Sequence, residues 1–582
     1  MKKLFAELKA YKIESIAAPL LKLSEAVLEL IVPLIVANIV DIGIKNTAGN
    51  NYIIGQSLLL LLLGIVGLGF AVTAQYFAAK AAVGVSANMR SRLFAKIQSF
   101  SFSDLDKHGT STLITRMTSD INQVQTGINM GLRLILRAPI IVFGATIMAF
   151  TINIQAALIF LCATLLLFVV IYAIMYITIP MYKKVQGNLD EVVNHTRENL
   201  TGARVIRAFS REDTETKDFD KSNSLLYKSQ IIVGRISAIM NPATYVIINL
   251  AIIWLIYSGA IKVDNGILSQ GQVIALYNYM LQILTELIKF ANLIITITKA
   301  AASGSRIYSI YEVEDTEKSP ENVGTLNFSS NNDVAVSFDN VSFSYNSNCE
   351  NYALENISFD IKKGEHFGII GGTGSGKSTL ISLISNFYNA TKGTISIFGN
   401  NINKYDIVSL RKNISVVLQK AVLFSGTIRE NLLWGNKDAT ENDMLEAIKL
   451  AQAENIISNK EGGLDATVEQ GGKNFSGGQR QRLTIARSLV GKPAILILDD
   501  SSSALDFATE AALRTSISSL KYNPTVITVS QRTSSVMHCD RIIVLYDGKI
   551  DAIGNHEYLL ENSKLYKEIY NSQFDEEVNL YE

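Results

Sequence analysis

The sequence predicts two halves of different fold class, an N-terminal membrane α-helical half with six spanning helices and a C-terminal α/β domain. Three observations predict this division. Long uncharged apolar runs fill the first half, the second half alternates short β-branched runs with amphipathic segments, and a glycine-rich loop there joins an apolar strand to a helix. We therefore expect a membrane domain at 1–310, a polar linker at 311–333 and an α/β domain at 334–582.

Composition excludes several classes of protein. The 582 residues include 53 basic and 53 acidic ones, and only 18% are charged, against about 25% in an ordinary soluble domain. No excess of positive charge is available for nucleic acid, so no nucleic-acid partner is expected. The apolar content of 48% excludes disorder. Cys162, Cys349 and Cys539 lie far apart, which argues against a disulfide framework or a zinc site.

The apolar runs account for the six spans and the lipid bilayer they imply. Uncharged runs of 34, 45, 26 and 21 residues cover 46–79, 138–182, 236–261 and 265–285. A spanning helix needs about 20 apolar residues, because in lipid its backbone polar groups must be bonded within the segment. The run of 45 is long enough for two helices with a turn at 151–155, and a further span is expected at 14–40.

Lysine and arginine indicate the orientation of the spans. Segments 80–116 and 183–235 are rich in both, whereas the opposite connections hold only Lys45 and Lys262. Basic connections stay on the cytoplasmic side. We expect a multi-pass protein of the cell inner (cytoplasmic) membrane, with both termini and the α/β domain in the cytoplasm and with spans that continue into the cytoplasm as helices.

Some charged residues fall within or beside the expected spans. They are Glu25, Glu29, Arg133, Arg137, Glu286 and Lys289. Charges at membrane depth often serve a function. The alternative is that they lie near helix ends, or that Glu286 and Lys289, three residues apart on one helix face, simply form an ion pair.

The glycine-rich loop at 371–378 reads G-G-T-G-S-G-K-S and matches the pattern G-x-x-x-x-G-K-[ST] in full. An apolar strand at 367–370 precedes it and a helix follows. In this context backbone amides hold phosphate oxygens, the lysine reaches the β and γ phosphates, and the serine binds Mg²⁺. The domain is therefore predicted to be a P-loop nucleotide-binding domain for ATP and Mg²⁺. Its loop residues are Gly371, Thr373, Gly374, Ser375, Gly376, Lys377, Ser378 and Thr379.

Two further motifs extend the prediction. Asp499 ends an apolar run at 495–498, as in a buried parallel strand that delivers a carboxylate to Mg²⁺. Ser476, Gly477, Gly478 and Gln479 precede a helix-compatible run and form a second anion-binding N-terminus. One nucleotide does not need two such sites, so we expect a head-to-tail dimer in which the second site binds ATP held by a partner.

These motifs together, after six spans, resemble the ATP-binding cassette exporters, specifically half-transporters of the multidrug type. The resemblance implies ATP hydrolysis coupled to efflux of an amphipathic small molecule, lipid or peptide. It implies that Tyr345 stacks on adenine, that Gln419 senses Mg²⁺ and contacts the membrane domain, and that 503–506 crosses the dimer interface. It also implies that 110–116 and 200–205 are cytoplasmic turns that dock on nucleotide domains, the second on the partner's domain.

Two residues depart from the family pattern. Asp500 stands where such exporters usually carry the glutamate that polarises the attacking water, and Gln531 stands where they carry a histidine. Aspartate is one methylene shorter, and a glutamine amide cannot hold a proton as imidazole can. Both departures fall on the site built around Lys377.

The departures suggest the degenerate-site subunit of a heterodimeric exporter. Such a subunit binds ATP and hydrolyses it poorly, while Ser476–Gln479 complete the hydrolysing site of a partner that carries the glutamate and histidine. Two alternatives remain open. One is a slow homodimeric exporter of lipid or peptide, and the other is an ATP-gated regulator or channel-like protein that does not pump.

Overall fold

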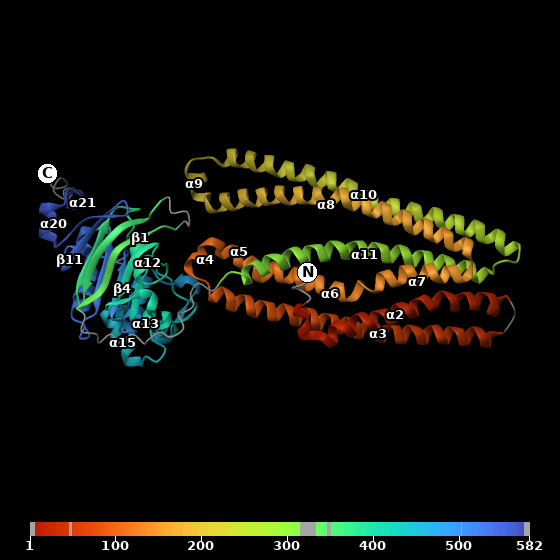
Figure 1. Cartoon of the computed structure of the whole chain (residues 1–582), viewed down its shortest axis with the longest axis horizontal. Helices are drawn as coiled ribbons and strands as arrows, with labels where there is room; N and C mark the ends of the chain where they lie inside the picture. Colours follow the sequence, from red (N-terminus) through yellow and green to blue (C-terminus); the bar gives the residue numbers. More distant parts are fainter. Residues whose placement is uncertain (1–5, 46–48, 315–332, 346–350, 502, 575–582) are drawn as a thin grey trace. The chain divides into compact units, whose positions relative to one another are not determined.

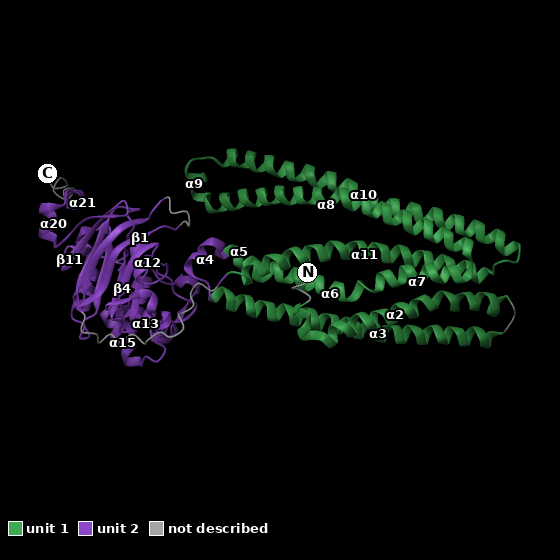
Figure 2. Ribbon diagram, viewed as in Figure 1, with its two compact units in different colours: residues 1–98, 111–313 green, residues 99–110, 314–582 purple. Residues whose placement is uncertain are grey.

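The computed structural model describes residues 6–45, 49–314, 333–345, 351–501 and 503–574. Cys349 and residues 315–332 of the expected linker lie outside this part of the chain. The chain divides into two compact units, one formed by 1–98 and 111–313 and the other by 99–110 and 314–582 (Figure 2). Each unit is described separately below.

The described part of the first unit consists of helices joined by short turns, and the prediction of six spans is confirmed. Its candidate spans are Leu8–Ile44, Asn50–Gln98, Thr110–Ile152, Ile154–Thr201, Glu212–Asp264 and Gln270–Tyr311. The α-helices within them are α2 (Lys12–Asn38), α3 (Asn50–Gln98), α5 (Thr110–Thr115), α6 (Ile121–Leu134), α7 (Arg137–Ile152), α8 (Ile154–Thr201), α10 (Glu212–Asp264) and α11 (Gln270–Tyr311), with α9 (Ala203–Ala208) between α8 and α10.

Several of these helices are longer than a membrane requires. α3, α8 and α10 have 49, 48 and 53 residues, against about 20 needed to cross the hydrocarbon core. The long uncharged run divides at Asn153, whose side-chain oxygen accepts a hydrogen bond from the Ala156 amide at 3.1 Å and caps α8. The turn therefore lies within the predicted 151–155.

Small and apolar residues pack the spans against one another. One buried cluster draws side chains from α2, α7, α8, α10 and α11. Tyr279 of α11 is fully buried in it, and its hydroxyl donates to the Leu30 carbonyl oxygen of α2 at 2.6 Å. A Cβ added to Gly127 of α6 would lie 2.2 Å from the Ala300 Cβ of α11, so only glycine allows this approach of the two backbones.

The second unit is an α/β domain, as predicted. Its strands are β1 (Val334–Phe343), β2 (Leu354–Lys362), β3 (His366–Gly371), β4 (Lys392–Ile397), β5 (Asn400–Asn401), β6 (Ile414–Val417), β7 (Gly426–Thr427), β8 (Thr467–Val468), β9 (Ile495–Asp499), β10 (Thr525–Ser530), β11 (Arg541–Tyr546) and β12 (Lys549–Gly554). A six-stranded sheet has the order β12-β11-β3-β10-β9-β6, in which all neighbours except β11 and β12 are parallel. A four-stranded antiparallel sheet has the order β2-β1-β4-β5.

Helices and short turns connect these strands (Figure 1). They are α12 (Lys377–Ile384), α13 (Ile407–Asn413), α14 (Ile428–Leu433), α15 (Glu441–Leu450), α16 (Glu454–Ser458), α17 (Gly477–Val490), α18 (Phe507–Ser518) and α19 (Thr533–Val536). After the last strand come α20 (His556–Asn562) and α21 (Lys564–Phe574), and α4 (Phe102–His108), which lies between α3 and α5 in sequence, also belongs to this unit.

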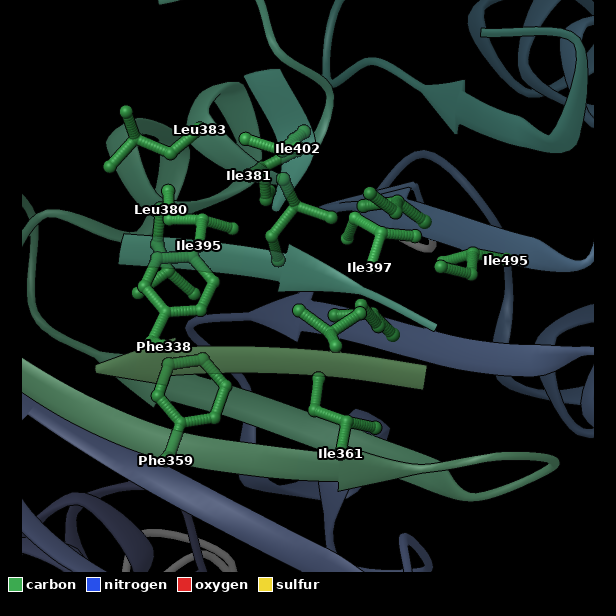
Figure 3. Close-up of a cluster of buried hydrophobic side chains, with 14 of the residues drawn as sticks. Phe338, Phe359, Ile361, Leu380, Ile381, Leu383, Ile395, Ile397, Ile402 and Ile495 are labelled. Atoms are coloured by element: carbon green, nitrogen blue, oxygen red, sulfur yellow. The ribbon is translucent and has the colours of Figure 1, made fainter. Parts of the chain in front are cut away.

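Alternating residues of the six-stranded sheet face two different cores. Ile495 and Ile497 of β9 lie in a cluster with β1, β2, β4 and α12, part of which is drawn in Figure 3. Leu496 and Leu498 of the same strand lie in a second cluster with helices α14, α15 and α17. The sheet therefore separates a β-rich core from a helical core, and each core supports a different nucleotide-binding motif.

The short helix α4 belongs to the second unit although its neighbours in sequence belong to the first. Phe102 stacks on Phe387 with ring centroids 4.2 Å apart, and the Tyr388 hydroxyl donates to the Asp106 carboxylate. Ser101 caps the start of α4, and Gly109 with φ of 70° ends it. The helix that packs on the α/β domain is thus α4, which directly precedes the turn expected at 110–116.

Candidate nucleotide-binding site

The phosphate loop connects β3 to α12, as its sequence predicts. Gly376 is the N-cap of α12 and has a left-handed φ of 98°, and Gly374 has a φ of 82°. A Cβ on Gly376 would also lie 2.6 Å from Leu354 Cδ2. Glycine is required at this position both for the backbone angle and for space. The loop thereby turns its backbone amides around the N-terminus of α12, where an anion is stabilised.

Lys377 is the first residue of α12, and its side chain turns back over the loop. Its Nζ donates to the carbonyl oxygens of Gly371 at 2.8 Å and Gly372 at 2.7 Å. Burial lowers the pKa of Lys377, while the charges of Asp499 and Asp500 act in the opposite direction. A partly buried ammonium group at the loop is suited to phosphate oxygens, because charge-assisted hydrogen bonds strengthen away from water.

The parallel register brings Asp499 and Gln531 to the same edge of the sheet as the loop. Asp499 of β9 pairs with Val529 of β10, and Ser530 pairs with Ile370 of β3. Because parallel strands end together, Gly371, Asp499 and the residue that follows β10 meet at one sheet edge. Ligands of open α/β sheets bind at this carboxyl edge.

Asp499 has the chemistry of a magnesium ligand. Burial raises the pKa of Asp499 to about 6, and the charge of Asp500 adds to this while Lys377 opposes it. The Asp499 carboxylate, the Ser378 hydroxyl and the Gln419 amide are oxygen donors of the kind Mg²⁺ prefers, and Mg²⁺ takes its other ligands from phosphates and water. Among the described residues no three His, Cys, Asp or Glu side chains form an all-protein metal site. The residues therefore fit a cation that is held together with a nucleotide.

Asp500 and Gln419 are hydrogen-bonded to each other. The Gln419 Nε2 donates to Asp500 Oδ2 at 3.1 Å. Asp500 itself adopts a left-handed φ of 45°, and its amide donates to the Val529 carbonyl oxygen at 2.8 Å. The backbone after β9 is therefore held in a bend that directs this carboxylate toward the glutamine.

Gln531 is held from two sides. Its side-chain oxygen accepts from the Thr373 hydroxyl of the phosphate loop at 3.4 Å, and its main-chain oxygen accepts from Gln573 Nε2 at 2.9 Å. Gln573 lies on α21, near the end of the described chain, and its oxygen accepts from both the amide and the hydroxyl of Thr533 at 2.8 Å. The sequence did not predict the role of Gln573, because no motif marks it and it lies 42 positions from Gln531 in the chain.

Tyr345 lies beside the phosphate-loop helix. Its hydroxyl is 3.1 Å from the Thr379 hydroxyl of α12, and its ring meets the Phe343 and Tyr388 rings edge to face. Tyr345 nevertheless remains 55% exposed. An exposed aromatic face next to a phosphate-binding loop is suited to stacking on a base.

The motif Ser476–Gln479 begins α17 and belongs to the helical core. Ser476 Oγ accepts from the Gln479 amide at 3.3 Å, and Gln479 Oε1 accepts from the Ser476 amide at 3.0 Å, a reciprocal capping box. Asp506, at the end of 503–506, likewise caps α18 by accepting from Thr509. No hydrogen bond of the described residues joins 476–479 to the phosphate loop. The structure gathers the other predicted site residues around the loop but leaves this motif on a separate core.

Comparisons with known proteins agree with this organisation. Residues 15–287 match the family model of the ABC transporter transmembrane region, and residues 354–503 match that of the ABC transporter. The chain is 37% identical over 580 residues to the uncharacterized ABC transporter ATP-binding protein YfiB of Bacillus subtilis (strain 168), covering 99% of both chains.

A second relative is the ATP-dependent lipid A-core flippase 1 of Colwellia psychrerythraea (strain 34H), which is 29% identical over 99% of this chain and 96% of its own length. The fold is similar to the solved structure of a bacterial Atm1-family ABC exporter with ATP bound, with a TM-score of 0.80 and 22% identity over 97% of this chain and 98% of that one. This chain belongs to the ATP-binding cassette transporters, as a half-transporter that joins one six-helix membrane domain to one ATPase domain.

Proposed function

We propose that this chain is the degenerate-site subunit of a heterodimeric ATP-driven exporter in the inner (cytoplasmic) membrane. The observation that carries the proposal is the presence of Asp500 and Gln531 beside Lys377, where exporters of this type carry glutamate and histidine. The loop 371–379 would hold ATP with its base on Tyr345. Ser378, Asp499 and Gln419 would hold Mg²⁺, which would neutralise phosphate charge.

The geometry of Asp500 supports slow hydrolysis at this site. General-base catalysis needs the carboxylate within about 2.6–3.2 Å of the attacking water, and the aspartate side chain is one methylene shorter than glutamate. The carboxylate is also engaged by the Gln419 amide at 3.1 Å. A misplacement of about 1 Å can cost about a hundredfold in rate.

The geometry of Gln531 supports the same conclusion. A glutamine amide can donate a hydrogen bond to the γ phosphate, but it does not change charge near neutral pH as histidine does. Contacts with Thr373 and Gln573 hold Gln531 beside the loop. Such a residue can help to hold ATP without taking part in proton transfer.

Two features support a partner chain. The capping box at Ser476 and Gln479 is complete, so the anion-binding end of α17 is well formed although its own phosphate loop lies on the other core. The region around α9 is apolar and exposed, with Leu200, Val205 and Phe209 at 75%, 61% and 74% exposure. Exposed apolar groups gathered around one short helix are typical of an interaction surface, and we assign this one to the partner's ATPase domain.

The work of the dimer is alternating access. ATP bound between a loop of one chain and the 476–479 motif of the other holds the two ATPase domains together, and the docked helices transmit this closure to the spans. A ligand that switches such an equilibrium fully must favour the closed state by about 5.5 kcal/mol. Hydrolysis at the competent site, which carries the partner's glutamate, then resets the exporter. The cargo is amphipathic, in the class of drug-like compounds, lipids or peptides.

A slow homodimeric exporter of lipid is the second candidate. The full-length similarity to a lipid A-core flippase of Colwellia psychrerythraea favours it. In that case Asp500 would act as the base in both sites of a symmetric dimer. An ATP-gated channel would retain ATP binding but show no accumulation of cargo against a gradient.

Co-expression with a half-transporter that carries the family glutamate and histidine separates these candidates. Replacing the partner's catalytic glutamate by glutamine should abolish transport, whereas Asp500→Asn should leave at least about half of the ATPase activity, because chemistry is confined to the other site. Loss of activity that is equally severe in Asp500→Asn would contradict the asymmetric dimer.

Restoring the family residues gives a converse test on the chain alone. Asp500→Glu combined with Gln531→His should raise its ATPase rate about 10- to 100-fold, since a placed general base contributes about that much or more. Lys377→Ala in the same background is the matched control and should remove this gain. Brisk turnover of the unmodified chain as a symmetric dimer would favour the homodimeric candidate instead.

A further inference from the structure

A cavity of about 470 Å³ lies in the membrane unit and carries charged groups that ATP binding and hydrolysis do not use. It is bounded by α2, α7 and α11. Its charged lining consists of Glu29, Arg137, Glu286 and Lys289, and Asn278, Gln282 and Thr285 add polar groups. Four charges around one cavity within the spans are costly in a bilayer, which points to a function.

The four charges form a chain of alternating sign. Arg137 Nη2 lies 2.8 Å from Glu29 and 3.5 Å from Glu286, and Lys289 Nζ lies 2.8 Å from Glu286. The predicted Glu286–Lys289 ion pair is thus present, but it is one link of a longer chain. Behind it, Arg137 Nη1 contacts Glu25 at 2.8 Å, and Glu25 contacts Lys22 at 2.5 Å. These six groups sum to zero charge.

Only the two ends of the four-charge chain are accessible. The side chains of Arg137 and Glu286 in the middle are 12% and 4% exposed, whereas those of Glu29 and Lys289 at the ends are 40% and 44% exposed. A ligand that enters the cavity therefore meets one carboxylate and one ammonium group. The buried middle members serve to hold these two ends in place.

Three lining residues also keep unsatisfied polar atoms. Arg137 Nε, Glu286 Oε2 and Gln282 Oε1 are buried and have no hydrogen-bond partner among the described residues, and Glu286 as a residue is only 3% exposed. Buried polar atoms without partners are uncommon, because each costs about 1–3 kcal/mol. Polar atoms left unsatisfied at the wall of a cavity indicate that something polar completes the site.

We propose that this cavity binds a zwitterionic group, with a ligand ammonium on Glu29 and a ligand phosphate or carboxylate on Lys289. This deepens the proposed exporter function and rests on it, since the bound group would belong to the cargo. A zwitterion pairs both open ends and leaves the site neutral. A ligand with a single charge would instead add an uncompensated charge to six groups that already sum to zero, in a medium where an uncompensated charge is strongly disfavoured.

The same chemistry has two sources, an ammonium-phosphate lipid headgroup or a water-soluble zwitterion. Four probes test which ligand charges the cavity requires and whether the ligand is a lipid or a soluble molecule. They are dihexanoyl phosphatidylethanolamine, soluble glycerophosphoethanolamine, dihexanoyl phosphatidylglycerol as an anion, and hexyltrimethylammonium as a cation. Binding to the purified full chain is measured by calorimetry without ATP, so that a failure of the ATP-site proposal does not affect the result.

The wild-type chain should bind one or both ethanolamine probes at least tenfold more tightly than the anion or the cation. A need for acyl chains identifies a lipid, and equal binding of the soluble probe identifies the free zwitterion. Equal binding of the single-charge probes would overturn the proposal whatever the behaviour of any variant.

Two substitutions should shift the preference in opposite directions. Glu29→Gln should weaken zwitterion binding about tenfold or more and make the anion the preferred probe, whereas Lys289→Met should make the cation preferred. Glu14→Gln, which removes a carboxylate on the same helix α2 at its separate ion pair with Lys80, is the matched control and should change neither. Unchanged probe preference in both Glu29→Gln and Lys289→Met would overturn the proposal.

Discussion

Asp499 titrates within the pH range in which ATP binding is easily measured. Burial raises its pKa to about 6, so the group is a carboxylate above this pH and a neutral acid below it. A proton and a divalent cation compete for the same oxygen atoms. The affinity for ATP with Mg²⁺ should therefore fall as the pH drops below 6, by up to about tenfold per unit.

Titrating a fluorescent ATP analogue from pH 5 to pH 7.5 checks this expectation. The pH dependence that remains in Asp499→Asn belongs to the nucleotide itself. The difference in ATP affinity between the two proteins at each pH therefore measures the effect of protonating the Asp499 carboxyl group. Measurements in excess chelator give the binding that does not depend on Mg²⁺. Identical pH curves for the variant and the unmodified chain would show that Asp499 does not bind the cation.

Single residues of the site were predictable where a motif is local in sequence. The phosphate loop could be predicted because glycines, lysine and serine at fixed spacing permit only one kind of backbone turn between a strand and a helix, and Gly376 has the left-handed φ this requires. The contacts of Gln531 were not predictable, because Gln573 reaches it from α21 through tertiary packing. The bond between Gln419 and Asp500 joins residues 81 positions apart and leaves no periodic signal.

Among the elements, the long spans were predictable and the short helices were not. Uncharged runs define the spans because lipid excludes unpaired backbone groups over about 20 residues. By contrast, α4 has seven residues, and its position depends on which aromatic rings of the same α/β unit lie opposite it. The interruption between α6 and α7 is equally local, yet it places Arg137 in the first turn of α7, at the cavity.

The aromatic contact of α4 carries a prediction about coupling. Phe102 stacks on Phe387, and the Arg411 guanidinium lies 6.0 Å and 5.4 Å from the two rings. An aromatic pair is worth about 0.5–1.5 kcal/mol beyond its buried area. Phe102→Ala should therefore leave ATP binding intact but weaken the link between ATPase domain and spans, lowering transport per ATP hydrolysed about 3- to 10-fold.

The ratio of transported cargo to released phosphate in proteoliposomes measures this coupling. Phe94→Ala is the matched control, because Phe94 is an exposed aromatic residue on α3, in the same chain but without this contact. A variant Phe102→Ala that transports as efficiently per ATP as Phe94→Ala would show that α4 does not transmit the motion.

At the scale of the whole molecule, the position of the two anion-binding motifs determines whether one chain can use both of them for the same nucleotide. The phosphate loop is supported by the β-rich core and the 476–479 motif by the helical core, with the sheet between them. The Ser476 side chain is used within its own chain to cap α17, but the N-terminal amides of that helix still present positive potential. A second chain is therefore needed for this end of the helix to meet a nucleotide.

Substitutions at the two adjacent glycines of that motif should affect folding and assembly separately. A Cβ on Gly478 would lie 2.9 Å from the Ala504 carbonyl oxygen, so Gly478→Ala should strain the chain itself. A Cβ on Gly477 meets nothing within 4 Å in the described residues. Gly477→Ala should leave the melting temperature within about 2 °C of the unmodified protein, since surface substitutions change stability by about 0.5 kcal/mol or less.

The same Gly477→Ala substitution should nevertheless slow hydrolysis by the assembled dimer, because in the proposed head-to-tail assembly the added methyl group would lie where the partner's nucleotide approaches. A displacement of about 1 Å there should cost about 10- to 100-fold in rate. Steady-state ATPase activity of the co-expressed pair, together with the thermal unfolding of each variant, checks both halves of the expectation. Full activity in a well-folded Gly477→Ala dimer would mean that this motif does not contact the nucleotide, and the head-to-tail assembly would have to be abandoned.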